Sequence, residues 1–305
     1  VQAAEVAAAA IGRLRSCSHI GVGEARVDRI ASTRRLLGDD GKIWAVRWTK
    51  SLDPVVRAAP EGLVDPMLKT VGFYDGDEPL ALLHYYAVHP TSIDGTGQVT
   101  PEFVGLARAR RTAESGVPHI YFTGCAGNIT AGKYNDGVAD NRELFAGRIR
   151  DAMVAAEQAL KRRPLSAVRW AVEKVCLPPR EDMDEAGLLT ALQQQTNAAK
   201  VHSKTALMLT YWRRRERPIP FSCLHLGEQV AIAHLPGETF IEYQLHAQAT
   251  RPDAFVAVAS YGDLGTGYIT LASSFAEGGY EPQDAFVSNA SEALMRAAID
   301  EILKK

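Results

Sequence analysis

Hydrophobic residues form a nearly continuous run from Leu80 to Val88, and polar residues follow it at once, from His89 to Ser92. Such a run is typical of an interior strand that is covered on both faces. Pro90 ends the strand because proline has no N–H to donate, and it favours an extended conformation for His89. The pattern predicts a core strand with an imidazole at its exit, where α/β proteins commonly place their chemistry. By position alone, a structural histidine that a backbone carbonyl satisfies is the simpler interpretation.

Similar patterns divide the rest of the chain into strands and helices. Further strands are predicted at residues 19–27, 43–48, 70–74, 119–123, 167–175, 221–226, 229–235 and 254–260. Helices are predicted at residues 1–14, 103–115, 141–161, about 239–249 and 285–303, with a polar helical segment at 183–215 and a loop at 53–66.

No internal repeat, low-complexity tract or linker interrupts this alternation. We therefore expect residues 1–305 to form a single domain of the α/β class, with a mixed β-sheet and helices packed on its faces. Residues 1–14 are strong helix formers without an N-cap residue, so we expect this helix to begin upstream and the domain to be N-terminally incomplete.

Four of the predicted strands end in the same way, in a polar or glycine-rich turn. These turns are His89-Pro90, Gly124 to Gly132, Pro236 to Glu238, and Gly262 to Tyr268. If the four strands lie in one sheet and their ends converge, an imidazole, a hydroxyl, a carboxylate and a phenol meet there. A His/Glu/Tyr set offers nitrogen and oxygen ligands that Zn²⁺ accepts, with an open position for water.

The composition changes this picture mainly by exclusion. The chain is 46% hydrophobic and 23% charged, as in ordinary globular proteins, and a net charge of -2 gives no support for nucleic-acid binding. No apolar stretch is long enough for a transmembrane segment. The four cysteines form no CxxC pair, which argues against a zinc knuckle. The basic run from Arg213 to Arg217 could bind an anion or a membrane surface, although a solvated helix end is the simpler interpretation.

Five short motifs, ordered along the chain, resemble the catalytic domain of the neutral/alkaline (non-lysosomal) ceramidase family. They are AVHPTS at 87–92, GCAGNIT at 124–130, LPGE at 235–238, GYIT at 267–270 and GGYEP at 278–282. The resemblance implies that His89, Glu238 and Tyr268 are zinc ligands. It also implies that Tyr280 and Arg34 bind the substrate.

Thr130 stands where the family has its catalytic serine. A threonine hydroxyl can still act as a nucleophile or donate a hydrogen bond, although its methyl group crowds the line of attack. The family's further zinc-binding histidine, upstream of the first helix, has no counterpart in this chain, and neither has the C-terminal accessory domain.

The resemblance implies a zinc-dependent hydrolase that cleaves an amide bond of a small-molecule or lipid-like substrate. Zn²⁺ would activate water, and Tyr268 or Thr130 would stabilise the developing oxyanion. Two alternatives stay open: a metal hydrolase of a small non-lipid amide or ester, and a non-catalytic homologue with a degraded site. If the three residues hold no metal, they have structural roles: His89 lies at the edge of the core, Glu238 caps the following helix, and Tyr268 packs in the core.

Overall fold

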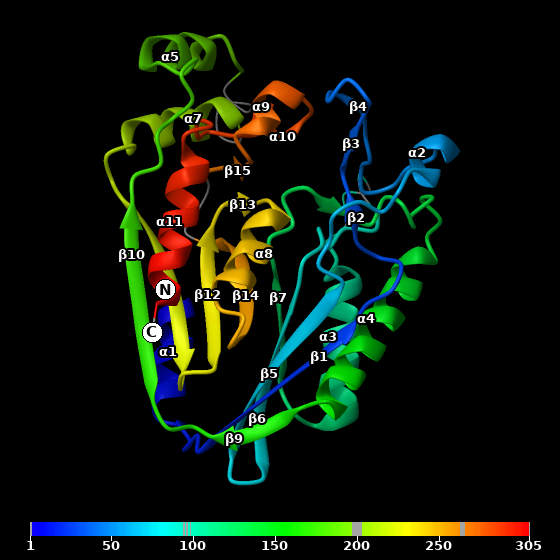
Figure 1. Ribbon diagram of the computed structural model, residues 1–305, viewed down its shortest axis with the longest axis vertical. Coiled ribbons are helices and arrows are strands. Elements are labelled where there is room, and N and C mark those ends of the chain that lie inside the picture. The colour runs from blue at the N-terminus through cyan, green and yellow to red at the C-terminus, as the bar shows by residue number, and fades with distance from the viewer. Residues whose placement is uncertain are drawn as a thin grey trace.

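The computed structural model describes residues 2–93, 95, 97, 99–196, 203–262 and 266–304, and two β-sheets form its centre (Figure 1). In spatial order, the five-stranded sheet contains β7 (His119–Thr123), β6 (Glu78–Tyr86), β5 (Met67–Asp75), β1 (His19–Arg26) and β9 (Lys161–Pro164). The four-stranded sheet contains β10 (Val168–Val175), β11 (Ile219–Leu226), β12 (Val230–Pro236) and β14 (Phe255–Gly262). Each sheet is antiparallel except for one parallel pair, β6 with β7 and β12 with β14. The expected mixed α/β class is confirmed, but the strands are divided between two sheets.

Side chains from both sheets form a core between them. Ile20, Val71 and Tyr85 come from the five-stranded sheet, and Ile232 and Ala257 from the four-stranded sheet. Alternate residues of β12 and β14 face the opposite side and contact helices. Because both faces of these strands are buried, their sequences are continuous apolar runs rather than alternating ones.

Helices cover the outer face of each sheet, so the molecule has four layers (Figure 1). α3 (Glu102–Ser115) and α4 (Asn141–Gln158) pack on the five-stranded sheet. α8 (Ile241–Thr250) and α11 (Ser291–Leu303) pack on the four-stranded sheet. The expectation that helices pack on the sheet faces is confirmed. Within the part of the chain that the structure describes, no helix is both long enough and apolar enough to cross a membrane.

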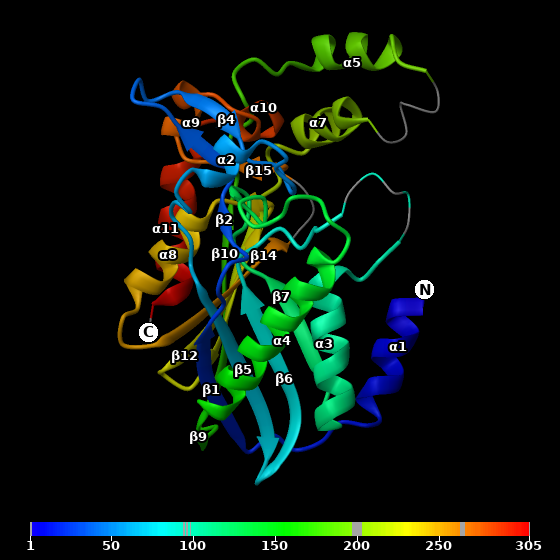
Figure 2. The same ribbon diagram turned by 90° about the vertical axis from the view of Figure 1, so that its right-hand side faces the viewer.

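Short elements gather at one end of the layers, where the chain leaves the strands (Figure 2). They are β2 (Ser32–Thr33), β3 (Arg35–Leu37), β4 (Ile43–Val46), β8 (Ile129–Thr130), β13 (Glu238–Thr239), β15 (Tyr268–Ile269), α2 (Pro54–Ala58), α9 (Ser273–Glu277) and α10 (Glu281–Asp284). At the same end, α5 (Glu185–Gln193) and α7 (Lys204–Arg213) pack on each other through Leu188 and Leu209. α1 (Gln2–Ile11) buries none of its residues and lies at the side of the molecule.

Three predicted boundaries are wrong because contacts distant in sequence replace the local preference. The helix expected over 141–161 ends at Gln158, and residues 161–164 pair with β1 as strand β9. The helix expected over 285–303 begins at Ser291, since residues 285 and 287 form β-bridges. The loop expected over 53–66 contains α2, whose first turn Asp53 caps by accepting from the N–H of Val55. Parts of three expected segments, residues 94, 96, 98, 197–202 and 263–265, lie outside the described residues.

Candidate functional site

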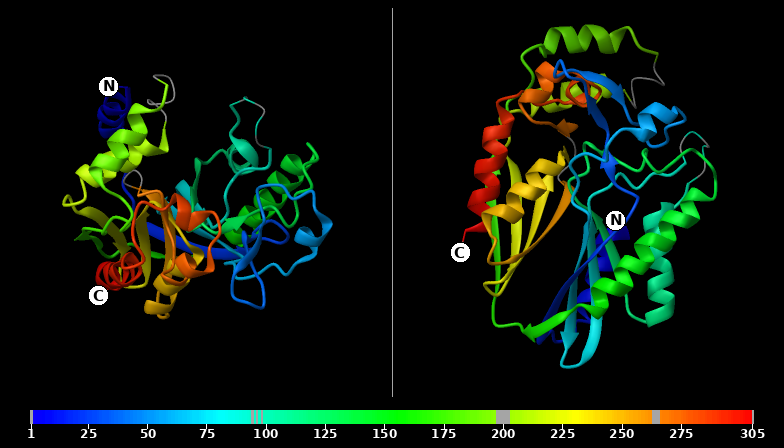
Figure 3. Two further views of the ribbon diagram at one scale, coloured as in Figure 1. Left: turned by 90° about the horizontal axis from the view of Figure 1, so that it is seen from above. Right: turned by 45° about the vertical axis from the view of Figure 1, so that its right-hand side comes forward.

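The four polar strand ends meet at one end of the molecule, although they leave two different sheets (Figure 3). β6 leads to His89 and β7 to the loop of residues 124–132, while β12 leads to Glu238 and β14 toward Tyr268. β13 and β15 pair in parallel, with Glu238 directly opposite Tyr268. The strand ends therefore converge as predicted, but they come from two sheets rather than from one.

His89 is half-buried against the loop of residues 124–132. Its Nδ1 lies 2.6 Å from the carbonyl oxygen of Ala126 and 3.1 Å from that of Ile129. Because both partners are acceptors, Nδ1 carries a hydrogen, and Nε2 is left as the ring nitrogen that faces the rest of the site. Nε2 lies 3.1 Å from Oε2 of Glu238. The contact is an ion pair when the imidazole is protonated, and it brings a nitrogen and an oxygen ligand atom together when it is not.

The bend at Gly237 positions Glu238. Gly237 has a φ of 64°, and a Cβ at this residue would lie 2.3 Å from Oγ1 of Thr266 and 2.9 Å from the carbonyl oxygen of Gly267. Both the left-handed backbone and the close approach require glycine. The N–H of Glu238 then donates to the carbonyl of Gly267 at 3.0 Å. The LPGE motif is therefore the turn that carries the carboxylate from the end of β12 to His89.

An N-capping role does not explain Glu238. The N-cap residue of the next helix, α8, is Phe240, and the first N–H of that helix, that of Ile241, donates to Oδ1 of Asn128 at 2.9 Å. The carboxylate of Glu238 contacts His89 instead.

Tyr268 is buried, and its phenol oxygen accepts a hydrogen bond of 3.0 Å from Nη1 of Arg34. Burial raises the pKa of Tyr268 above its ordinary value, while the Arg34 cation acts in the opposite direction. The Arg34 guanidinium lies over the rings of Tyr268 and Tyr280, 5.6 and 5.7 Å from their centroids. It also lies 3.7 Å from the buried carboxylate of Glu281. The structure thus brings together Arg34, Tyr268 and Tyr280, the first predicted from the Thr-Arg-Arg segment and the other two from the motifs.

Thr130 has contacts typical of a structural residue. Its side chain is fully buried, and its hydroxyl donates to the carbonyl of Arg47 at 3.1 Å and accepts from the N–H of Gly132 at 3.3 Å. No hydrogen bond joins it to His89 or Glu238 in the described part of the chain. The structure therefore does not present this hydroxyl to the His89–Glu238 pair.

Tyr261 is a site residue that the motifs did not single out. Its ring meets His89 edge to face, with centroids 6.0 Å apart, and its φ of 66° is unusual for a residue other than glycine. The available signal was its place directly after the apolar strand 254–260, which matches the place of His89 after its own strand.

A cavity of about 970 Å³ opens beside these residues. Glu238, Tyr261, Tyr268 and Tyr280 line it, together with apolar side chains from the segments around α7 and β11. A volume of this size is within the range of ligand-binding pockets. The strand ends that carry Glu238 and Tyr268 therefore adjoin a space that can hold a ligand with a large apolar part.

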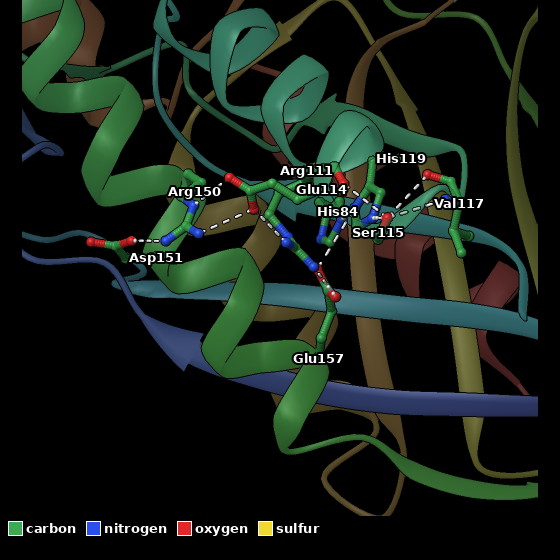
Figure 4. Close-up of polar contacts among 9 residues, drawn as sticks. All are labelled: His84, Arg111, Glu114, Ser115, Val117, His119, Arg150, Asp151 and Glu157. Atoms are coloured by element: carbon green, nitrogen blue, oxygen red, sulfur yellow. Dashed lines mark hydrogen bonds and ion pairs between the residues drawn. The ribbon is translucent and has the colours of Figure 1, made fainter.

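A second group of potential metal ligands lies between the five-stranded sheet and its two covering helices (Figure 4). His84, His119 and Glu157 offer ligand atoms within 4.8 Å of one another, close enough to hold a metal ion. The two rings already contact each other, with Nε2 of His84 2.8 Å from Nδ1 of His119. Glu157 accepts two hydrogen bonds, of 3.1 and 2.7 Å, from the guanidinium of Arg111.

Hydrogen bonds account for this second group without a metal. The outer ring nitrogens contact Thr70 Oγ1 at 2.9 Å and Ser115 Oγ at 3.0 Å, so all four nitrogens have partners. Burial lowers the pKa of His84 to about 3, which keeps this ring neutral. A chain of neutral rings that runs from Thr70 to Ser115 satisfies every donor and acceptor, and the Arg111 cation disfavours a second positive charge beside Glu157. The His89–Glu238 pair is therefore the better candidate for a metal centre.

Comparison with known proteins bears on the fold. No protein-family model and no curated protein matches the sequence. The chain is similar to the crystal structure of neutral ceramidase from Pseudomonas aeruginosa, with a TM-score of 0.66 and 16% sequence identity, covering 94% of this chain and 52% of that one. It is also similar to a structure of ceramidase complexed with C2, with a TM-score of 0.65, 14% identity, and coverage of 94% and 53%. The chain thus has a fold found in neutral ceramidase and spans about half the length of these structures.

Proposed function

We propose that this chain is a metal-dependent hydrolase that cleaves an amide bond, with an activity like that of neutral ceramidase. The observation that carries the proposal is the contact of 3.1 Å between Nε2 of His89 and Oε2 of Glu238, which brings a nitrogen and an oxygen atom that could hold a metal into one site. The fold shared with neutral ceramidase supports it. The large cavity beside Glu238 supports a lipid-like amide as the substrate.

His89, Glu238 and Tyr268 would hold the metal, and we propose zinc because an imidazole, a carboxylate and a phenol form a nitrogen and oxygen ligand set that zinc accepts. When bound, Zn²⁺ lowers the pKa of a coordinated water and polarises a carbonyl group. The carbonyls of Ala126 and Ile129 hold the hydrogen on Nδ1 of His89 and so keep Nε2 available as a ligand atom.

Tyr268 and Arg34 would act on the negative charge that develops on the amide oxygen. Since the Tyr268 oxygen accepts its hydrogen bond from Arg34, the phenol O–H can donate into the cavity. Such a donor, held in place before the reaction, stabilises an oxyanion. Tyr280 lies beside the same guanidinium and lines the cavity, where it would contact the substrate.

Thr130 would have to leave the carbonyl of Arg47 before its hydroxyl could act as a nucleophile. We therefore propose water as the nucleophile and a structural role for Thr130 in the loop that orients His89. The same buried hydroxyl favours the second candidate function, a non-catalytic binding protein. Stoichiometric zinc binding without hydrolysis of either short-chain or long-chain N-acyl amides would support that candidate.

Two histidine variants test the proposal and decide between the two potential metal groups. His89→Ala should abolish both zinc binding, measured by elemental mass spectrometry after dialysis, and release of fatty acid from a long-chain N-acyl amide. His84→Gln is the matched control, and it should keep both because hydrogen bonds satisfy that group without metal. Glu238→Gln keeps the size of the side chain and should also lose zinc. A zinc-loaded, active His89→Ala protein would contradict the proposal.

Rates measured with acyl chains of different length distinguish a lipid-like substrate from a small polar amide or ester. The apolar lining of the cavity predicts that kcat/KM rises with the length of the acyl chain, since each buried CH₂ contributes about 0.8 kcal/mol. Equal rates for acetyl and dodecanoyl amides would favour the small polar substrate instead.

A further inference from the structure

The cavity beside Glu238 and Tyr268 combines an apolar wall with a basic rim. The apolar part of its lining comprises Leu177, Leu207, Tyr211, Ile219 and Phe286. The basic part belongs to α7 and the residues that follow it, and comprises Lys204, Arg214, Arg215 and Arg217. Figure 2 shows α7 beside β15, the strand of Tyr268. A ligand in this cavity therefore meets the proposed catalytic residues and the cations together.

Two of these four basic side chains already have partners within the chain. Lys204 pairs with the carboxylate of Asp284, which also lines the cavity. Arg215 lies over the ring of Trp212, 4.6 Å from its centroid, and donates to the carbonyl of the same residue. The charge of Lys204 is therefore balanced by Asp284, and the side chain of Arg215 is held against Trp212.

Arg214 and Arg217 differ from their neighbours. In the described part of the chain, no carboxylate pairs with either guanidinium, although both line the cavity. Arg213, one residue earlier, pairs with Glu185 at 2.7 Å and does not line the cavity. Stabilisation of a helix C-terminus by basic side chains explains Arg213 well. It does not explain why the next two unpaired arginines lie at the edge of an apolar cavity.

The chemistry that complements this arrangement is an apolar chain with an acidic group. Guanidinium groups bind planar oxyanions through paired N–H···O bonds. A bound apolar chain excludes water from the cavity and so strengthens this attraction. The carboxylate of Asp284, which shares the cavity, opposes it little, because it pairs with Lys204.

We infer that the substrate is an anionic amphiphile, an N-acyl amide that carries a carboxylate, sulfonate or phosphate group for Arg214 and Arg217. The cleavage of this compound rests on the proposed function, whereas its binding does not. Both arginines are exposed, so with a neutral long-chain amide their guanidinium groups would contact only solvent. Arg214 and Arg217 are then the residues that determine specificity for the acidic group.

Binding is tested without hydrolysis by comparing decanoate with the neutral decanol in titration calorimetry. Wild-type protein should bind decanoate more tightly, and the double variant Arg214→Gln/Arg217→Gln should lose about tenfold or more of the decanoate affinity, because it lacks both charged donors to the carboxylate. Decanol binding should not change. Arg213→Gln is the matched control and should leave both affinities as in wild type. Equal loss of decanoate affinity in the control and the double variant would overturn the inference.

Hydrolysis is then compared for N-dodecanoylglycine and N-dodecanoylethanolamine, which share the acyl chain and differ in the carboxylate. The wild-type preference for the glycine conjugate in kcat/KM should vanish in the double variant. Cleavage of both compounds without preference would refute the anionic substrate and leave the hydrolase intact. Cleavage of neither, with arginine-dependent decanoate binding, would refute the hydrolase and support the anion site.

A membrane surface is the rival explanation of the basic rim. Vesicles with and without phosphatidylglycerol test it by sedimentation. If the double variant loses vesicle binding but retains full decanoate affinity, the arginines serve a membrane surface and the inference is wrong.

Discussion

Two backbone carbonyls determine how His89 can react. By accepting from Nδ1, the carbonyls of Ala126 and Ile129 orient the ring so that Nε2 faces Glu238. The two interpretations of this residue, a histidine satisfied by a carbonyl and a metal ligand, are therefore not exclusive. One nitrogen has the structural contact, and that contact gives the other nitrogen its chemistry.

The buried pair His84 and His119 illustrates the opposite case, in which every ring nitrogen has a partner within the fold. Between pH 6.5 and about 3, unfolded His84 binds a proton that folded His84 does not, so stability falls as the pH falls through this window. We expect this residue alone to lower the free energy of unfolding by about 2 kcal/mol between pH 7 and pH 5.

The measurement is urea unfolding at pH 7 and pH 5 for wild type and His84→Gln. The variant is less stable at pH 7, but its loss on acidification should be smaller than that of wild type by the amount stated. Equal losses in the two proteins would show that His84 does not titrate in this way.

At the scale of elements, the short parallel pair β13–β15 places Glu238 opposite Tyr268. Only two residues of each strand pair, so the alignment depends on the turn at Gly237 and its contacts with Thr266 and Gly267. A small change in this turn moves the carboxylate relative to both His89 and the phenol.

Gly237→Ala should destabilise the protein by at least about 1–3 kcal/mol, because it forces a left-handed backbone on alanine and places Cβ against Thr266. It should also weaken zinc binding, because the turn positions Glu238. The control is Gly147→Ala in the interior of α4, where a Cβ meets no atom within 4 Å. This change should stabilise the protein by about 0.5–1 kcal/mol. Thermal unfolding of both variants measures these opposite changes in stability. An unchanged stability of Gly237→Ala would show that the turn tolerates a side chain.

At the scale of the whole molecule, the proposed metal centre joins the two sheets. His89 follows a strand of the five-stranded sheet, and Glu238 follows a strand of the four-stranded sheet. An ion held by both would connect the two halves at the same end as the cavity. Metal binding should therefore stabilise the complete fold rather than one loop.

Zinc should raise the free energy of unfolding by about 2.7 kcal/mol when free zinc is one hundred times the dissociation constant, since only the folded state has the assembled site. Thermal unfolding with a zinc titration, reversed by a chelator, measures this effect. His89→Ala should show no stabilisation, whereas His84→Gln should respond as wild type does. An undiminished response in His89→Ala would place the ion elsewhere.

The sequence by itself determined the α/β class, most of the strands and the five motifs, because hydrophobic periodicity and turn residues are local properties of the chain. It also placed His89, Glu238 and Tyr268 at strand ends. Only the tertiary structure decided that these ends belong to two sheets, that the hydroxyl of Thr130 is engaged by the Arg47 carbonyl, and that Arg214 and Arg217 border the cavity. Such facts depend on contacts between residues far apart in the chain, and local preferences for helix or strand carry no information about which distant partner a side chain meets.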